Sequence, residues 1–376
     1  MSEIGPDDVT TDGVIVHEWY ESHGGAEAVV DRLRGLLPGA ELHCLWVDGE
    51  RIDPTSVRES WLARTPLRRR KALALPMMPI AWRNVGAHHR WAIISTHLFA
   101  HHYSERANRD LKKLAYVHTP ARYIWAPEVD PRGANVAARI ASPLLRPIDR
   151  QRAGELDSIA ANSEFVRQRI MRAWERDSRV IYPPVAAAEI SRRVMQVEDP
   201  VAWGVPRWTS EPFLLAASRL VTYKRIDAAI AAASAAGLPL VVAGSGPDRP
   251  RLEAIAADSA VPVYFAGRVS DDLLHSLYSR AAAFVFPAVE DFGIMPVEAL
   301  ASGTPIVVNA IGGAAEILGS SRVGSTFDVA SASDAVEAIQ KAIGSSPDEC
   351  RRRSLEFDVS NFDRSIHAWL SDSDIS

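Results

Sequence analysis

The chain has 376 residues, which exceeds what one hydrophobic core usually serves and therefore predicts two domains. Its 47% hydrophobic and 24% charged residues are typical of a globular protein and exclude a chain that is disordered over most of its length. The net charge of -5 gives no global electrostatic reason to bind nucleic acid, so we expect no nucleic-acid partner.

The cysteines and the apolar runs favour a cytoplasmic protein. Cys44 and Cys350 lie far apart without metal-ligand spacing, as expected of reduced thiols. Residues 1–13 lack the apolar core of a signal peptide. No apolar run approaches the length of a transmembrane helix.

Short apolar runs alternate with helical stretches almost from end to end, a pattern typical of parallel sheets covered by crossover helices on both faces. In the first half, we expect strands at 14–16, 42–47, 91–94, 114–117, 159–161 and 180–182. In the second half, we expect strands at 213–217, 238–243, 261–266, 283–286 and 305–308. The expected helices there are 227–236, 248–257, 271–279, 296–301 and 332–343.

The domain boundary is expected near Pro183, because the prolines that follow break both helix and strand. The first domain covers 1–185 and the second 186–360. Aromatic and apolar residues in helical spacing over 357–370 predict a C-terminal helix, about 361–376, that packs back on the first domain. Doubly wound domains bind ligands at the carboxyl ends of their strands, which predicts an active site in a cleft between the two.

The most informative motif follows the strand that ends at Phe286, where a turn with Gly293 leads into a helix. Unpaired amides at a helix start attract phosphate, and glycine lets the backbone approach a ligand closely. Glu290 and Glu298 can accept hydrogen bonds from hydroxyl groups at opposite ends of one elongated ligand. Taken alone, Glu298 fits equally well as a partner of the helix dipole, and Glu290 as a solvated loop charge.

A second motif carries two cations, Arg219 and Lys224, in the loop after the first strand of the second half. Such cations could neutralise a departing pyrophosphate. Considered alone, they are more often solvated surface charges. A metal ion would need carboxylate ligands, and the only Asp-x-Asp stands at the extreme terminus, at Asp372 and Asp374. We therefore expect no metal.

Glycines and a histidine mark three further loops. Gly24 and Gly25 precede a helix and would allow close approach of a phosphate or an acceptor, but the full dinucleotide fingerprint is missing, which counts against an NAD-dependent enzyme. Gly244 and Gly246 match that fingerprint only in part. A strand ends at His118, which could donate to a sugar hydroxyl or serve a structural role, the commoner case for a lone histidine.

Together these segments resemble glycosyltransferases of the GT-B fold, family 4, over nearly the whole chain. Residues 290–299 are similar to the family's pattern of two glutamates around a Phe-Gly core. The resemblance implies an α/β protein of two facing Rossmann-like doubly wound domains, the first binding the acceptor and the second the nucleotide sugar. It also implies a retaining, metal-independent enzyme that moves a hexose from a nucleotide diphosphate sugar to an acceptor hydroxyl, without a further cofactor.

The resemblance assigns roles to individual residues. Glu290, His118, Arg219 and Lys224 are the expected catalytic residues. The expected donor-binding residues are Gly25, Ser218, Arg219, Lys224, Gly244, Arg268, Val269, Asp271, Glu290, Phe292, Gly293, Ile294, Met295 and Glu298. The expected acceptor-binding residues are His23, Gly24 and Tyr123.

Three segments point to a subgroup of the family. His118-Thr119-Pro120, 122–125 and 161–163 are similar to bacterial GDP-mannose-dependent mannosyltransferases. Mannose is therefore the expected hexose, in the synthesis of cell-envelope polysaccharide, glycolipid or glycoside. A UDP-sugar donor remains an alternative, and so does a noncatalytic nucleotide-sugar-binding protein. His97 stands where family members often carry a small residue, and His101 and His102 crowd the same region, so donor or acceptor preference could differ.

The stretch 61–82 combines basic and apolar residues; its cations are Arg64, Arg68, Arg69, Arg70 and Lys71. This combination suits peripheral contact with an anionic membrane at its inner face, where a lipid-linked acceptor could be presented. An ordinary amphipathic element with a solvated basic side is the alternative.

Overall fold

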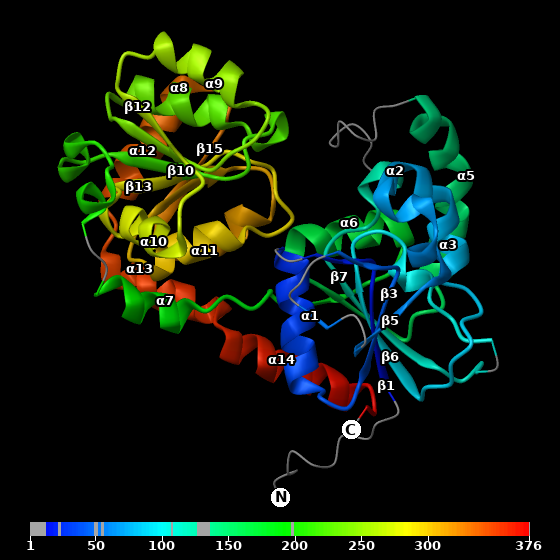
Figure 1. Ribbon diagram of the computed structural model, residues 1–376. Coiled ribbons are helices and arrows are strands. Elements are labelled where there is room, and N and C mark those ends of the chain that lie inside the picture. Colours follow the sequence, from blue (N-terminus) through cyan, green and yellow to red (C-terminus); the bar gives the residue numbers. More distant parts are fainter. Residues whose placement is uncertain are drawn as a thin grey trace, which may run out of the picture. The chain divides into compact units, whose positions relative to one another are not determined.

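The computed structural model describes residues 13–21, 24–48, 52–53, 56–106, 108–125, 136–196 and 199–375 (Figure 1). The chain divides into two compact units: unit 1 is Met1–Pro184 with Phe362–Ser376, and unit 2 is Val185–Asn361. The boundaries expected after 185 and 360 lie next to these limits. Each unit is built on one parallel sheet, and the predicted α/β class is confirmed.

Unit 1 contains a seven-stranded sheet in the order β5-β3-β1-β6-β7-β8-β9, in which every pairing is parallel. β1, β6 and β7 are buried along nearly their whole length, which explains why they appear in the sequence as continuous apolar runs. The strands are β1 (Gly13–His17), β3 (Glu41–Cys44), β5 (Val57–Glu59), β6 (Trp91–Thr96), β7 (Lys112–Val117), β8 (Ser158–Ala161) and β9 (Arg179–Val180).

Helices cover both faces of this sheet. On one face, α1 (Gly25–Leu36) and α14 (Val359–Asp372) share a core cluster with alternate residues of the central strands, such as Ile15 and Ile93. Arg32 of α1 also pairs with Asp363 of α14. The other face carries α4 (Arg122–Trp125), α5 (Val136–Ala153), α6 (Glu164–Trp174) and the segment 61–82.

Asp149 of α5 ties together the elements on that second face. Its carboxylate accepts hydrogen bonds from the indole Nε1 of Trp125 at 2.7 Å and of Trp174 at 2.8 Å, and lies 3.1 Å from His102 Nε2. Burial alone would raise the pKa of Asp149, but the neighbouring His101 and His102 and these donors hold the pKa well below its usual range. This buried carboxylate is therefore fully surrounded by donors.

Unit 2 contains a six-stranded parallel sheet in the order β12-β11-β10-β13-β14-β15. Its strands are β10 (Leu214–Ala217), β11 (Leu240–Ala243), β12 (Val263–Gly267), β13 (Ala283–Phe286), β14 (Ile306–Asn309) and β15 (Gly324–Phe327). Its helices are α7 (Ala187–Val194), α8 (Ile226–Ala236), α9 (Arg249–Ala257), α10 (Asp271–Arg280), α11 (Ile294–Ala301), α12 (Ala332–Ile343) and α13 (Pro347–Ser354). All five strands expected in this half are present.

Two expectations were wrong in detail. The strand expected at 42–47 ends at Cys44, because the Leu45 amide turns to the Glu18 carbonyl at 2.7 Å. Val47–Asp48 (β4) then pairs with Tyr20–Glu21 (β2) in a separate two-stranded sheet. The segment 61–82 forms a series of short turns, not one amphipathic element: η2 (Trp61–Arg64), η3 (Pro66–Arg69), α2 (Lys71–Ala74), η4 (Leu75–Met77) and α3 (Met78–Ala81).

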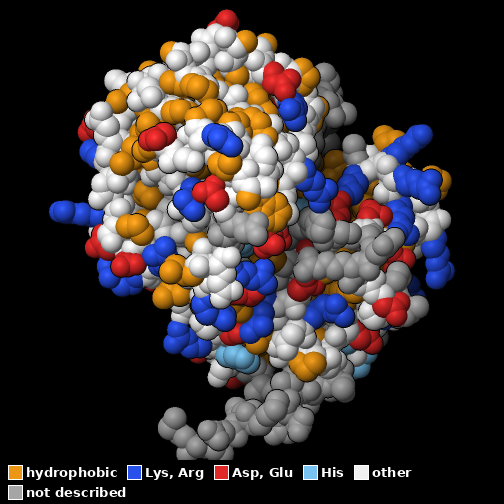
Figure 2. All heavy atoms as spheres, turned by 60° about the vertical axis from the view of Figure 1, so that its left-hand side comes forward, with side chains coloured by type: hydrophobic (Ala, Val, Ile, Leu, Met, Phe, Trp, Pro, Cys, Tyr) orange, Lys and Arg blue, Asp and Glu red, His pale blue; other side chains and the backbone are white. Residues whose placement is uncertain are grey.

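The helices and the surface charge bear on contact with membranes and nucleic acids. Within the described ranges, none of the helices combines the length and apolar composition needed to cross a lipid bilayer. Basic and acidic side chains are interspersed over the face drawn in Figure 2, in keeping with a chain of 42 basic and 47 acidic residues.

The strand order reverses once in each sheet. In unit 1 the chain runs outward from β1 to β3 and β5, then returns to β6 on the other side of β1. In unit 2 it runs from β10 to β11 and β12, then returns to β13 on the other side of β10. The loops that leave the two strands at such a switch point diverge to opposite faces and leave a crevice, the usual ligand site of open α/β sheets.

Candidate active site

An ion pair spans the switch point of unit 2. Lys224 lies in the short turn η9 (Thr222–Lys224) after β10, and Glu290 lies in the loop after β13. The Lys224 ammonium donates to Glu290 Oε1, and the two side chains are only 16% and 22% exposed. The sequence predicts this cation and this carboxylate from separate motifs, and the structure brings them into contact.

Ser218 and Arg219 begin the same loop after β10. Arg219 is exposed and donates from Nη2 to the Tyr223 hydroxyl at 2.9 Å. Gly244, after β11, packs against this loop, because a Cβ there would lie 1.8 Å from the Ser218 carbonyl oxygen. A Cβ on Gly246 would lie 2.2 Å from the Leu220 carbonyl oxygen. Close backbone packing therefore accounts for both glycines without a ligand.

The loop that carries Glu290 is held in place by residues that the sequence analysis missed. Asn309, at the end of β14, donates from Nδ2 to the Pro287 carbonyl at 2.9 Å. The Gly313 amide donates to the Glu290 carbonyl at 2.8 Å, and a Cβ on Gly313 would lie 2.1 Å from the Asp291 carbonyl oxygen. The Gly-Gly pair at 312–313, directly after an apolar strand, is the signal that could have revealed this contact.

The helix α11 begins directly after this loop. Gly293 caps it with φ of +111°, a conformation that favours glycine. Phe292 is buried, and its ring lies 5.6 Å from that of Phe357, so its side chain packs within unit 2. Ile294 and Met295 open the first turn, where helix amides lack intrahelical partners. The role that the resemblance gives to these amides stays a prediction.

Glu298, in α11, is a second carboxylate of the predicted site, and the charge of Asp271 acts on it. Burial, followed by the charge of Asp271, raises the pKa of Glu298 to about 7. Asp271 opens α10 after the edge strand β12, preceded by Arg268, which is exposed, and Val269, which is half-buried. Among the described residues, Lys224 pairs with Glu290, whereas the guanidinium of Arg219 donates to Tyr223.

Unit 1 carries a second cluster at its own switch point. Glu18 directly follows β1, and its Oε1 accepts hydrogen bonds from the loop after β6. The donors are the amides of His97 at 3.1 Å, Leu98 at 2.8 Å and Ala100 at 3.0 Å, and the hydroxyl of Thr96 at 2.9 Å. Although burial opposes ionisation, the nearby histidines and these amides lower the pKa of Glu18 to about 2. The sequence analysis did not single out Glu18.

His118 is linked to this cluster through Ser95. His118 Nε2 lies 2.8 Å from Ser95 Oγ, which lies 3.1 Å from His17 Nδ1. Burial, followed by the neighbouring His97 and His17, lowers the pKa of His118 to about 3. His118 is therefore neutral at pH 7.

The remaining predicted residues of unit 1 lie at two helix starts. Gly24 caps α1 and Gly25 begins it, and a Cβ on Gly24 would lie 2.0 Å from the Glu27 carboxylate. This negative charge disfavours a phosphate here and suits an acceptor hydroxyl. Tyr123 lies in α4, and its carbonyl accepts a hydrogen bond from Ser142 Oγ at 3.0 Å. His23 lies outside the described residues.

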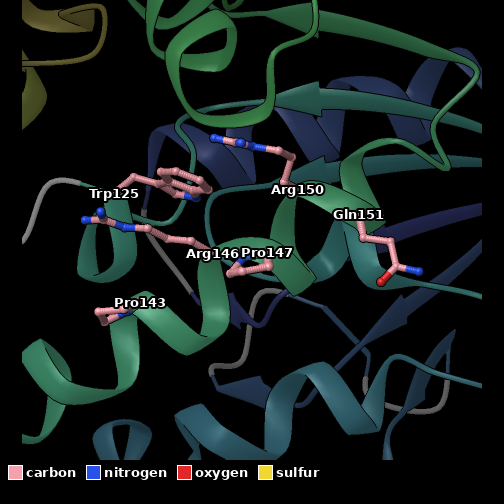
Figure 3. Close-up of a pocket in the computed structure, with 6 residues that line it drawn as sticks. All are labelled: Trp125, Pro143, Arg146, Pro147, Arg150 and Gln151. Carbon is pink, nitrogen blue, oxygen red and sulfur yellow. The ribbon is translucent and has the colours of Figure 1, made fainter.

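A hollow beside α5 involves none of the predicted site residues (Figure 3). The guanidinium carbons of Arg146 and Arg150 lie 5.4 and 5.6 Å from the ring centre of Trp125. The lining residues are Trp125, Pro143, Arg146, Pro147, Arg150 and Gln151.

Comparison with solved structures defines the class of the protein. Sucrose-phosphate synthase from Thermosynechococcus elongatus aligns with a TM-score of 0.69 and 17% identity, covering 96% of this chain and 98% of that one. HepE of Anabaena, in complex with UDP and glucose, aligns with a TM-score of 0.65 and 16% identity, covering 96% and 99%. The chain therefore has the GT-B fold, as predicted.

Sequence comparison narrows the class. Residues 205–354, which lie within unit 2, match the family described as Glycosyl transferases group 1. Over 228 residues, the chain is 26% identical to the GDP-mannose-dependent alpha-(1-6)-phosphatidylinositol monomannoside mannosyltransferase of Mycobacterium tuberculosis, covering 54% of this chain and 56% of the relative. The matches span 21% and 56% of the first two curated relatives. The predicted resemblance to GT-B glycosyltransferases, with similarity to mannosyltransferases, is confirmed.

The packing of Gly313 against the Glu290 loop yields a prediction. Gly313→Ala is expected to displace residues 287–293 and to lower the free energy of unfolding by about 1–3 kcal/mol, because the added methyl group overlaps backbone atoms. Hydrogen–deuterium exchange should rise in peptides that cover this loop. Gly35→Ala is the control, since a Cβ there meets nothing within 4 Å and alanine favours the helix. Unchanged exchange in the Gly313 variant would contradict the role of this contact.

Proposed function

We propose that this chain is a retaining, metal-independent glycosyltransferase that transfers mannose from GDP-mannose to an acceptor hydroxyl, in the synthesis of cell-envelope polysaccharide or glycolipid. The observation that carries the proposal is the Lys224–Glu290 pair at the switch point of unit 2, within the residues that match Glycosyl transferases group 1. A cation suited to a diphosphate and a carboxylate suited to a sugar lie in contact there.

In this proposal, unit 2 binds the donor. Arg219 and Lys224 neutralise the diphosphate, and Glu290 accepts a hydrogen bond from a hydroxyl of the sugar. The amides of 292–295 donate to the sugar and the phosphates at the start of α11. At the other end, Glu298 accepts hydrogen bonds from the ribose hydroxyls, with the base near 268–271. Arg219 is exposed, and its guanidinium would exchange its hydrogen bond to the Tyr223 hydroxyl for one to the phosphate.

The proposed transfer proceeds on one face of the sugar. The bond between the anomeric carbon and the phosphate oxygen breaks, and the acceptor oxygen bonds to the same carbon from the same side. The acceptor proton moves to the departing phosphate oxygen, so the configuration is retained without a covalent intermediate. Lys224 and Arg219 stabilise the negative charge that develops on the diphosphate. His118, neutral at pH 7, donates to a sugar hydroxyl.

The choice of donor rests on the relatives named above, among which is a GDP-mannose-dependent enzyme. The alternative donor is a UDP-sugar, since the structure of HepE holds UDP and glucose. A thermal-shift panel of nucleotide sugars separates the two, because the preferred donor raises the melting temperature most. A noncatalytic nucleotide-sugar-binding protein would show such a shift but release no nucleoside diphosphate.

Replacement of the carboxylate at the switch point tests the activity. Glu290→Gln is expected to lower turnover at least about 100-fold, because the amide cannot replace the charge that positions the sugar. Donor binding should survive, since Lys224 becomes free to bind the diphosphate. Release of GDP from GDP-mannose, including slow transfer to water, gives a readout that needs no known acceptor.

The matched control is Glu337→Gln, which removes an exposed carboxylate that pairs only with Lys341 one helical turn away. Its turnover should equal that of the wild type. Near-normal turnover in the Glu290 variant would refute the role of that residue.

The raised pKa of Glu298 predicts how donor affinity depends on pH. Ribose hydroxyls donate to the ionised carboxylate, so binding should lower the pKa of Glu298 from about 7 and release a proton. GDP affinity should therefore rise between pH 6 and pH 8. Isothermal titration calorimetry at pH 7, in two buffers of different ionisation enthalpy, measures the proton released.

Glu298→Gln is expected to remove this proton release. Because the folded-state pKa lies above the unfolded one, Glu298 contributes stability at low pH that is lost as the pH rises toward and beyond 7. The variant should thus gain stability over the wild type at pH 8. Proton release that is unchanged in the variant would assign it to another group.

We also propose that the segment 61–82 contacts an anionic membrane from the cytoplasmic side. Its apolar side chains Trp61, Leu73 and Ile80 are 47%, 59% and 58% exposed. Of its five cations, Arg68 and Lys71 pair with Asp48 and Glu21 within unit 1, while the other three, Arg64, Arg69 and Arg70, are exposed. Exposed cations beside exposed apolar side chains suit the lipid boundary. α5, with Leu144 72% exposed, lies on the same face of the sheet.

Vesicle co-sedimentation tests this contact. The variant with Arg64→Ser, Arg69→Ser and Arg70→Ser should bind phosphatidylglycerol vesicles roughly 100-fold more weakly, at about 1 kcal/mol for each basic residue. The control replaces three exposed arginines elsewhere, Arg172, Arg192 and Arg352, with serine. Equal recovery of the wild type with neutral and anionic vesicles would remove the proposal.

A further inference from the structure

Three side chains at the switch point of unit 1 gather around one place. His17 ends β1, Glu18 follows it, and His97 follows the neighbouring strand β6. One ligand atom from each residue lies within 4.8 Å of the other two. The side chains of His17 and Glu18 are fully buried, whereas His97 is 27% exposed and opens the cluster to solvent.

The cluster contains buried polar atoms without partners. Glu18 Oε1 is occupied by four donors, but Glu18 Oε2 has no hydrogen-bond partner, and neither do His97 Nδ1 and His17 Nε2. A buried ionised oxygen without a partner costs free energy, which a bound cation would offset.

One of the two distances to Glu18 Oε2 matches the spacing of ligands around a metal ion of the first transition row, and the other is longer. Glu18 Oε2 lies 3.3 Å from His97 Nδ1 and 4.0 Å from His17 Nδ1. Ligands about 2.0–2.2 Å from a tetrahedral zinc ion lie a little over 3 Å from one another. Two histidines and one carboxylate are also a ligand set that zinc takes in proteins, with the fourth position left open.

A second group of two histidines and one carboxylate is less suited to a metal ion. His101, His102 and Asp149 also lie within reach of one another. The Asp149 carboxylate, however, already accepts the indole protons of Trp125 and Trp174, and a metal ion would have to displace them. The Glu18 cluster differs because Glu18 Oε2 accepts no hydrogen bond, although His17 Nδ1 contacts the Ser95 carbonyl at 3.2 Å and the Ser95 hydroxyl at 3.1 Å.

We propose that His17, Glu18 and His97 form a binding site for a transition-metal ion, zinc by its ligand chemistry, that joins the end of β1 to the loop after β6. Ser95 Oγ contacts both His17 and His118, so the ion lies one hydroxyl group away from the predicted sugar-contacting histidine. All the ligands come from unit 1. The proposal therefore does not rest on the proposed transferase activity, whose diphosphate site belongs to unit 2.

Titration of the metal-stripped full-length protein tests the site. We expect one equivalent of Co²⁺ per chain, with the visible absorption of four-coordinate cobalt, displaced by one equivalent of Zn²⁺ but not by Mg²⁺, which prefers oxygen ligands. The melting temperature should rise with Zn²⁺ concentration, since the ion binds only the folded protein. No stoichiometric uptake by the wild type would overturn the proposal.

Variants assign the ligands. His97→Ala keeps the backbone amide that donates to Glu18, so the loop should stay folded while zinc affinity falls at least roughly 100-fold. His88→Ala removes an exposed histidine as the control and should bind like the wild type. Uptake that persists in the His97 variant, or is lost only in His102→Asn, would place the ion at the second group and overturn the assignment.

Discussion

The Lys224–Glu290 contact depends on the order of the strands in unit 2. These residues lie far apart in the sequence, and they meet because β10 and β13 are neighbours at the point where the strand order reverses. The position of the Glu290 loop also depends on the neighbouring strand β14: Asn309, at its end, and Gly313, beyond it, both donate to carbonyls of this loop. Any register or order that separated β10 from β13 would leave a cation and a carboxylate in unrelated loops.

In unit 1, a reversal of strand order also brings two loops together, but the residues that meet there are different. Its reversal brings the end of β1 next to the end of β6, where a carboxylate, Glu18, takes the place that a cation and carboxylate share in unit 2. Glu18 fixes the loop after β6 through backbone amides, and thereby fixes where His97 lies. His118, at the end of β7, joins the cluster through Ser95. In both sheets, the reversal of strand order brings together the loops that form a site, and the two sites differ in charge.

Much of this architecture could be predicted from the sequence, because strands buried on both faces appear as continuous apolar runs. The Glu290–Glu298 motif was equally accessible, since it is contiguous and its glycine marks the start of α11. Contacts between distant segments were not. Glu18 stands in the sequence as an ordinary acid beside a histidine, and Asn309 as a polar residue that ends a strand. β15 (Gly324–Phe327) escaped because glycine, serine and threonine fill most of it.

The surroundings of Asp149, Glu298 and Glu18 distinguish a carboxylate with a structural role from one that can bind a ligand. Asp149 is ionised at a place where indole and imidazole donors surround it, so nothing further is needed and it serves packing alone. Glu298 lies beside another carboxylate, Asp271, and burial holds its pKa near 7, an arrangement that weakens the folded state above that pH. Glu18 has one oxygen fully occupied and the other without a partner. Carboxylates whose charge is not fully paired are found in folded proteins mainly at functional sites. Glu298 and Glu18 both lie at or beside the crevices that the reversed strand order creates.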